Sequence, residues 1–162
     1  WESIDAHKTF ENTPEFQPFL SKIMEKLVAS DPTIFHVKFP AEYSGSDSPF
    51  TMPVTECLAG FFSPDYRQEE YNTQFSTFRA KAAEVPNSGA KGLIGGWSVQ
   101  SHQHENLGEG VGGKLFAAFI GWPTVEAHME FRKTEDFARI IPLLREGIKG
   151  MKVWHVAFQQ YK

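Results

Sequence analysis

An internal repeat constrains this sequence more than any other feature. Residues 1–23 read WESIDAHKTFENTPEFQPFLSKI, and residues 122–144 read WPTVEAHMEFRKTEDFARIIPLL. A Trp, an Ala-His pair, a Thr and two Phe recur at matching places. A second pair of stretches follows, TIFHVKF at 33–39 and KVWHVAF at 152–158, with the offset reduced from 121 to 119 residues. Agreement of order and residue type in both blocks indicates two copies of one structural unit.

The two copies differ in extent. Residues 54–162 form a complete copy, whereas residues 1–39 match only its last part. Between them, residues 40–53 read PAEYSGSDSPFTMP and are rich in Ser, Gly and Pro, which is typical of a linker. The first copy lacks its opening strands, and the chain lacks an initiator Met, so we expect a fragment. A first repeat that is natively reduced is the alternative.

Composition excludes several classes of protein. The 162 residues carry a net charge of −4 without a basic run, which argues against nucleic acid or an anionic membrane as the partner. The single cysteine, Cys57, excludes a disulfide framework and a cysteine-rich zinc site within one chain. No apolar run is as long as a membrane span, and no signal peptide is visible. We therefore expect a cytoplasmic protein in a reducing compartment.

The complete copy shows the pattern of a ferredoxin-like unit. Short apolar runs predict strands, and the spacing of Tyr71, Phe75, Phe78 and Ala82 predicts one face of a helix. The resulting order, β-α-β-β-α-β, is that of an α+β, ferredoxin-like fold. The expected elements are strands at 54–62, 92–104, 114–122 and 152–161, a helix that starts at Ser63-Pro64, and a helix that starts at Thr124, breaks near 133 and resumes. Pro142 fits that interruption better than one straight helix.

Helices cover only one face of such a sheet, so the other face must be covered by something else. Two sheets can face each other and close a barrel. A tandem repeat would close it within one chain as an internal pseudo-dimer. Because the first copy is incomplete here, the second copy would need another chain, which predicts a homodimer.

The motif set resembles a known superfamily. A strand that ends in Trp, then Ser/Thr-x-x-Ala-His-x-x-Phe and Thr-x-x-Phe, within a βαββαβ order, is similar to the dimeric α/β-barrel superfamily. The resemblance is to its antibiotic biosynthesis monooxygenase (ABM)-like group, in the fungal-type tandem form. It covers residues 54–162 fully and 1–39 in part. The resemblance implies a dimeric α/β barrel, but it does not fix an activity, because the superfamily contains several chemistries and also proteins without known chemistry.

Two characterised branches of the superfamily use side chains that this sequence lacks. The haem-degrading branch uses a Trp in the second helix and a His further along, and haem iron needs such a ligand. The plant polyketide cyclase uses a Tyr and a His in the same helical segment. The corresponding positions here carry apolar residues, namely Phe10, Phe16 and Leu20 in the first copy and Phe131, Phe137 and Ile141 in the second.

Histidines are the candidate acid–base groups, because His titrates near neutral pH. His7 and His128 lie on the core-facing stripe of the repeated helix, and His36 and His155 lie in the repeated strand. Side chains alternate along a strand, and we expect the bulky set that includes Trp154 to meet the helices. His155 would then face the barrel lumen, which makes it the first candidate for the base and His128 the second. A structural, hydrogen-bonded histidine is the alternative for each.

Aromatic residues make up 14% of the chain, which suits a cavity with flat apolar walls. We expect Trp97, Trp122, Phe116 and Phe119, with His36 and His7, to bind a planar ligand in the lumen, although aromatic residues on strands are more often part of a core. His102 and His104 are weak candidates for metal ligands, since alternation puts both rings on one face but a third ligand is not evident. A polar strand end is the alternative.

These features favour a small-molecule enzyme of the ABM-like group, with a cofactor-independent monooxygenase as one possibility and a cyclase or isomerase as others. The substrate would be a planar aromatic or polyketide-like compound in the lumen. Oxygenation without a cofactor needs a base that forms a substrate anion, which itself reduces oxygen. The alternative is a non-catalytic barrel that binds a ligand or has a structural role, which the missing residues of the characterised branches favour.

Overall fold

A computed structural model describes residues 2–27, 33–39 and 48–158 of the chain. Trp1 and residues 40–47, which include most of the expected linker, lie outside the described residues. The chain divides into two compact units, residues 1–36 and 37–162, and each is described by itself.

The first unit contains two helices, α1 (Ile4–Glu11) and α2 (Phe16–Leu27). Helix α1 starts where the Ser3 side chain accepts a hydrogen bond from the backbone N–H of Ala6 at 3.0 Å, which is a helix N-cap. The Phe10 ring meets Phe16 and Phe19 edge-on, with centroids 5.6 and 5.8 Å apart. These aromatic contacts join the two helices.

The second unit is built around an antiparallel sheet. Its main strands are β2 (Val54–Phe62), β3 (Lys91–Ser98), β5 (Gly112–Trp122) and β6 (Gly150–Val156). They are ordered β3-β5-β2-β6, and β1 (Val37–Lys38) adds to the outer edge of β3. The short β4 (His102–Gln103) pairs with the start of β5. The described residues of this unit also form two 3-10 helices, η2 (Pro49–Thr51) and η3 (Glu105–Leu107).

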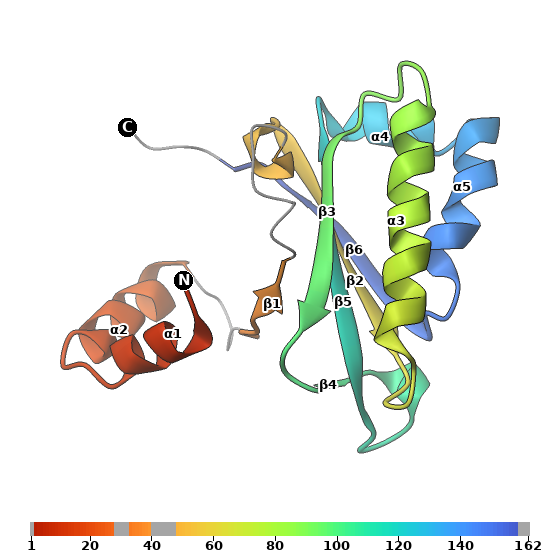
Figure 1. Ribbon diagram of the computed structural model, residues 1–162. Coiled ribbons are helices and arrows are strands. Elements are labelled where there is room, and N and C mark those ends of the chain that lie inside the picture. The colour runs from red at the N-terminus through yellow and green to blue at the C-terminus, as the bar shows by residue number, and fades with distance from the viewer. Residues whose placement is uncertain (1, 28–32, 40–47, 159–162) are drawn as a thin grey trace. The chain divides into compact units, whose positions relative to one another are not determined.

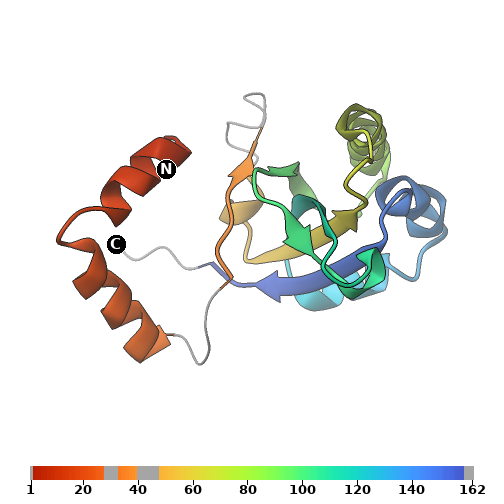
Figure 2. The ribbon, with the colours of Figure 1, turned by 90° about the horizontal axis from the view of Figure 1, so that it is seen from below.

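Helices α3 (Gln68–Glu84) and α5 (Glu135–Arg145) lie on one face of this sheet, and the short α4 (Val125–Phe131) precedes α5 (Figures 1 and 2). Strand, helix, two strands, helix and strand therefore follow one another as a ferredoxin-like fold requires. The predicted α+β, ferredoxin-like class is confirmed. The barrel that would cover the other face of the sheet remains a prediction.

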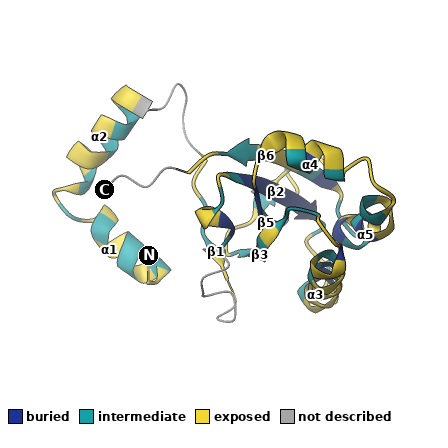
Figure 3. Cartoon of the chain, turned by 90° about the horizontal axis from the view of Figure 1, so that it is seen from above, coloured by how far each residue is buried: buried dark blue, intermediate teal, exposed yellow. Residues whose placement is uncertain are grey.

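The hydrophobic core lies between the sheet and these helices. Phe62 of β2 and Tyr71 and Phe75 of α3 are almost fully buried, and so is Phe116 of β5. Figure 3 shows the buried residues concentrated in the strands, while the outer sides of the helices are exposed. Burial of such large rings is the main favourable contribution to folding of this unit.

One local prediction about helices is wrong. Ser63-Pro64 does not start the helix that follows β2, because the chain turns there and α3 begins only at Gln68. Pro142 lies within α5, after the predicted break. The predicted break between α4 and α5 is confirmed, and Thr124 and Thr134 cap the two helices.

The opposite face of the sheet carries the odd-numbered residues of β2. Thr55 is fully buried and its hydroxyl donates to the carbonyl of Pro49 at 2.9 Å, which holds η2 against this face. Phe119 meets Phe39 and Phe50 edge-on. Aromatic residues therefore cover part of this face within the unit. No helix in the described part of the chain is long and apolar enough to cross a membrane.

Candidate active site

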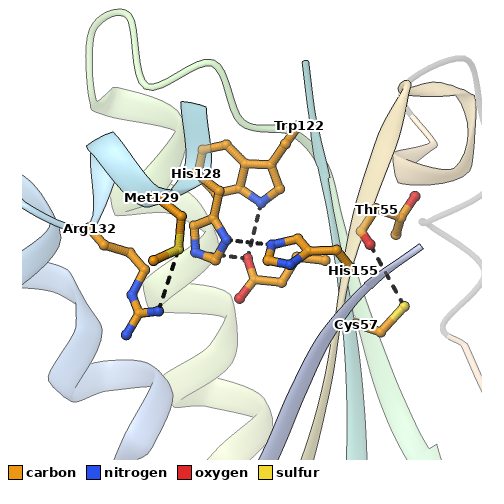
Figure 4. Close-up of polar contacts among 8 residues, drawn as sticks. Thr55, Cys57, Trp122, His128, Met129, Arg132 and His155 are labelled. Atoms are coloured by element: carbon orange, nitrogen blue, oxygen red, sulfur yellow. Dashed lines mark hydrogen bonds and ion pairs between the residues drawn. The ribbon is translucent and has the colours of Figure 1, made fainter. Parts of the chain in front are cut away.

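A buried carboxylate forms the centre of the candidate site. Glu56 lies in the middle of β2, on the helix side of the sheet, and is only 6% exposed. The indole Nε1 of Trp122 donates to its Oε2 at 3.0 Å, and Nε2 of His128 lies 3.4 Å from the same oxygen. Both contacts are drawn in Figure 4. A buried carboxylate is tolerated only where such donors compensate for lost water.

His128 connects this carboxylate to a second imidazole. Thr124 caps α4, so His128 comes one helical turn later and points back to the sheet. Its ring stacks on the Trp122 indole, with centroids 4.7 Å apart and planes 18° apart. Its Nδ1 lies 2.8 Å from Nε2 of His155, which pairs with Glu56 across β6 and β2. Glu56, His128 and His155 therefore form a continuous series of polar contacts, called here the Glu–His–His relay: His128 and His155 share a hydrogen bond, and Glu56 and His128 approach to 3.4 Å.

The positions of the protons follow from the donors available. Trp122 Nε1 can only donate, so Oε2 of Glu56 accepts from it. When Glu56 is ionised, His128 must carry its proton on Nε2 to donate to the carboxylate. Its Nδ1 then accepts from Nε2–H of His155. The carboxylate thus fixes one tautomer for each of the two imidazoles.

Burial favours the neutral forms of both the Glu56 carboxyl group and the His128 imidazole. Burial raises the pKa of Glu56 above its ordinary value, while the Trp122 hydrogen bond and the Arg132 charge oppose that rise. Burial also lowers the pKa of His128 to about 4, and the neighbouring His155 and Arg132 add to the effect. The His128 imidazole is therefore neutral at neutral pH, and the raised pKa makes the Glu56 carboxylate, once ionised, a stronger base than an exposed carboxylate.

A small cavity borders the relay between the sheet and helices α3, α4 and α5. Its volume is about 150 Å³, and Glu56, Trp122 and His128 line it together with Phe78 and Phe131. An apolar cavity of about this size can hold one benzene ring. The site therefore offers a carboxylate and an imidazole at the wall of a space that fits one aromatic ring.

A second pair of histidines occurs in the first unit. Nδ1 of His7 in α1 lies 2.6 Å from Nε2 of His36, and Nε2 of His7 lies 3.6 Å from a carboxylate oxygen of Glu11. The same ring nitrogens face each other as in the His128–His155 pair. Here, however, Glu11 belongs to the same helix as His7 and its side chain is 44% exposed. Among the described residues of the first unit, the carboxylate beside this pair of imidazoles is thus an exposed one.

The predicted orientation of His155 is wrong. His155 pairs with Glu56, so its side chain lies on the helix side, whereas Trp154 lies on the opposite face and is 44% exposed. The bulky set does not meet the helices because the hydrogen bond to His128 brings the imidazole to that side. The interior of a barrel closed over the opposite face would not contain His155.

Three of the four predicted wall aromatics are also on the helix side. Trp97 and Phe116 pack with Tyr71 in the core, and Trp122 lies against His128. Only Phe119, among these four, points to the opposite face. The prediction that all four line one lumen is therefore wrong, because Phe116 and Phe119 are three positions apart along β5 and alternation puts them on opposite faces.

The rings of His102 and His104 both face Phe61, with ring centroids 6.5 and 4.5 Å from it. His102 Nε2 lies 2.7 Å from the Ser98 hydroxyl, and His104 Nδ1 accepts from the backbone N–H of Asn106. Within the described ranges, no group of three His, Cys, Asp or Glu side chains is placed to hold a metal ion.

Glu56 was not predicted as a site residue. It is an acidic residue within the apolar run VTECLAGFF, and this alone indicates a buried side chain that needs a partner. The adjacent Cys57 points to the other face, and burial raises the pKa of its thiol to about 11. A thiol of such a pKa is almost fully protonated at neutral pH and is a poor nucleophile.

The relay gives a testable pH dependence of stability. Between pH 6.5 and about 4, the unfolded chain binds a proton at His128 that the folded chain does not, so stability falls with falling pH. We expect this histidine to account for a loss of up to about 3 kcal/mol of unfolding free energy. Urea unfolding at pH 7, 5.5 and 4.5 measures it.

Glu56 acts in the opposite direction. From pH 4.5 up to its raised folded pKa, the folded chain holds a proton on Glu56 that the unfolded chain has released, so acidification there adds stability. We therefore expect His128→Gln to flatten the pH dependence and Glu56→Gln to make it steeper. A His128→Gln variant that kept the full wild-type slope would contradict the assignment.

The fold and the site together define the class of protein: a ferredoxin-like α+β unit with a buried carboxylate and imidazoles between sheet and helices. The sequence matches no protein-family model and no curated protein. Among solved structures, a "putative monooxygenase" from Lactobacillus acidophilus is similar to 96% of this chain, with a TM-score of 0.52 and 11% sequence identity. This chain spans only 65% of that protein.

Two further solved structures are similar to part of the chain. One is a dimeric ferredoxin-like protein of unknown function from Thermobifida fusca, with a TM-score of 0.44, 14% identity and coverage of 67% of this chain and 94% of that protein. The other is a dimeric ferredoxin-like protein of unknown function from Bacteroides fragilis, with a TM-score of 0.40, 10% identity and coverage of 66% and 98%. At such identities, the comparisons establish likeness of fold alone.

Proposed function

We propose that this protein is a small-molecule enzyme, specifically a cofactor-independent monooxygenase of the ABM-like kind that acts on a planar aromatic compound. One observation carries the proposal. Glu56, a buried carboxylate of raised pKa, lines a largely apolar cavity that fits an aromatic ring and that Arg132 and Arg145 also line, and both contacts of Glu56 among the described residues use Oε2. Its Oε1 is thus left to accept a proton from a substrate.

The proposed reaction balances with oxygen as the oxidant. Glu56 removes the phenolic proton of the substrate, and the resulting anion gives one electron to O₂ to form a radical pair. A carbon–oxygen bond then forms at the ring carbon opposite the hydroxyl, and the peroxide takes the proton from Glu56. Loss of the ring hydrogen with cleavage of the O–O bond gives a quinone and water, so one phenol and one O₂ yield one quinone and one H₂O.

The two histidines of the relay support this step. His128 donates to Oε2 and stabilises the carboxylate, and His155 holds His128 in the tautomer that does so. Both histidines predicted as catalytic thus belong to the proposed machinery. Glu56 takes the position next to the substrate, with His128 beside it in the cavity wall, and His155 is a positioning residue.

We also propose the architecture in which this site operates. Residues 1–39 are a partial copy of the complete unit 54–162, and a second sheet covers the open face in a homodimer or pseudo-dimer. Matching local geometry supports the repeat. In both copies, a Thr between the two helices donates its hydroxyl to the carbonyl of a Phe three residues earlier. The distance is 2.8 Å from Thr13 to Phe10 and 2.7 Å from Thr134 to Phe131. The histidine pairs match as well.

A non-catalytic barrel is the second candidate. The observation that favours it is that, in the described part of the chain, no buried side-chain nitrogen or oxygen lacks a hydrogen-bond partner. A fully satisfied cluster is what a purely structural role requires.

A substrate panel distinguishes the two candidates. Phenols and dihydroxybenzenes that have one aromatic ring and an unsubstituted ring carbon opposite a hydroxyl are incubated with the protein in an oxygen electrode, and products are analysed by mass spectrometry under ¹⁸O₂. We expect at least one compound to consume one O₂ per product and to gain one labelled oxygen atom. Oxygen uptake no faster than with Glu56→Gln protein for every compound would overturn the proposal and leave the non-catalytic barrel.

A further inference from the structure

A second hollow lies on the helix side of the sheet, apart from the cavity at Glu56. It has a volume of about 360 Å³ and lies between α3 and the edge where β1 joins β3. Phe75, Trp97 and Phe116 form its aromatic side, and we call it the α3 hollow. Its volume is in the range of small-molecule sites, and no residue that lines it lines the Glu56 cavity.

Glycines in β3 give this hollow its aromatic floor. A Cβ on Gly95 would lie 2.5 Å from a ring carbon of Phe116 and 2.8 Å from one of Phe75, so only glycine lets both rings approach the strand. A Cβ on Gly96 would collide with the backbone carbonyl of Lys38, so this glycine lets β1 join the edge. Gly95 thus allows the aromatic rings to form the floor of the hollow, and Gly96 allows β1 to form its edge.

Helix α3 presents a row of polar side chains to the hollow. Gln68, Asn72 and Ser76 are spaced four residues apart, which places them on one face of the helix. Asn72 Oδ1 accepts from the indole Nε1 of Trp97 at 2.8 Å, which fixes the orientation of the amide. The Nδ2 of Asn72 therefore remains as a donor at the hollow.

Lys38 is the charged residue among the described residues that line the hollow. It pairs with Trp97 across β1 and β3, so its side chain lies on the same side of the sheet as the indole. None of these described lining residues is a carboxylate. An ammonium and an amide donor beside aromatic rings are complementary to a flat ligand that carries an anionic group.

We propose that the α3 hollow is a binding site for small aromatic carboxylates. The ring packs against Phe116 and Trp97, and the carboxylate accepts from Lys38 and Asn72. This site is independent of the proposed oxygenase reaction, since it shares no residue with the relay.

The test uses the full chain labelled with ¹⁵N and two probes of equal shape, 2-naphthoate and the neutral 2-naphthylmethanol. Titration is followed by the indole N–H resonances and by calorimetry, and Trp97→Phe assigns the Trp97 signal. We expect 2-naphthoate to shift the Trp97 indole and to bind about tenfold more tightly than the alcohol, as one charge-assisted contact allows.

Two charge-removing variants make the test specific. Lys38→Gln should remove the preference for 2-naphthoate and leave binding of the alcohol unchanged, whereas Lys81→Gln, on an exposed part of α3 outside the hollow, should change neither. Equal affinity for both probes, an unchanged preference in Lys38→Gln, or shifts at Trp122 instead of Trp97 would overturn the proposal. Shifts at Trp122 would place binding in the Glu56 cavity, so the two proposals fail separately.

Discussion

Glu56→Gln should lower turnover of an oxidised substrate by about 10²- to 10⁴-fold, the range that general acid–base catalysis contributes. The amide keeps the shape of the side chain and an oxygen that can accept from Trp122, but it cannot take up a proton. The measurement is steady-state oxygen uptake, with the substrate identified by the panel. KM should change much less than kcat, because the lost interaction belongs to the proton transfer.

The stability of this variant separates catalysis from a structural role. Since burial raises the pKa of Glu56, removing its charge should leave the unfolding free energy equal to or above that of the wild type at pH 7. Glu130→Gln is the matched control, because Glu130 is exposed on α4 and pairs with Lys133. Loss of stability with full activity in Glu56→Gln would contradict the catalytic assignment and favour a structural role.

Trp122→Ala should destabilise the fold by about 3–5 kcal/mol, the usual cost of deleting a buried large aromatic side chain. Trp122 is 2% exposed, stacks on His128 and donates to Glu56. The deletion opens space in the core and also leaves Oε2 with one donor fewer. Urea unfolding at pH 7 gives the change in free energy.

Trp122→Phe divides this effect into its two parts. Phenylalanine keeps most of the apolar contact but has no N–H, so we expect a loss of about 1–3 kcal/mol from the hydrogen bond to a charged acceptor. The loss should shrink when Glu56→Gln is already present, because the two residues are in contact. Additive effects of the two substitutions would show that the Trp122–Glu56 hydrogen bond does not matter for stability.

Periodicity allowed much of the fold to be predicted. The apolar run at 54–62 and the spacing of Tyr71, Phe75 and Phe78 correspond to β2 and α3, and the Thr caps mark the break between α4 and α5. These features depend on neighbours in sequence. The start of α3 was misplaced because Ser63-Pro64 also suits a turn, and the turn was adopted.

The candidate site was predicted only in part. His128 and His155 were singled out, and they lie in contact. The expected lumen was wrong because alternation along a strand gives two sets of side chains without saying which set meets the helices. Glu56 was missed because its significance comes from Trp122 and His128, which are far from it in the chain and adjacent in space.

The sequence by itself determined the repeated motif, the β-α-β-β-α-β order and the placement of one candidate histidine in a helix and the other in a strand. These properties depend on local spacing and residue type. Only the tertiary structure decided the face on which His155 lies, the burial of Glu56 and the position of the cavities. Strand register across β2, β5 and β6 fixes these, and register arises from packing of the whole sheet against its helices.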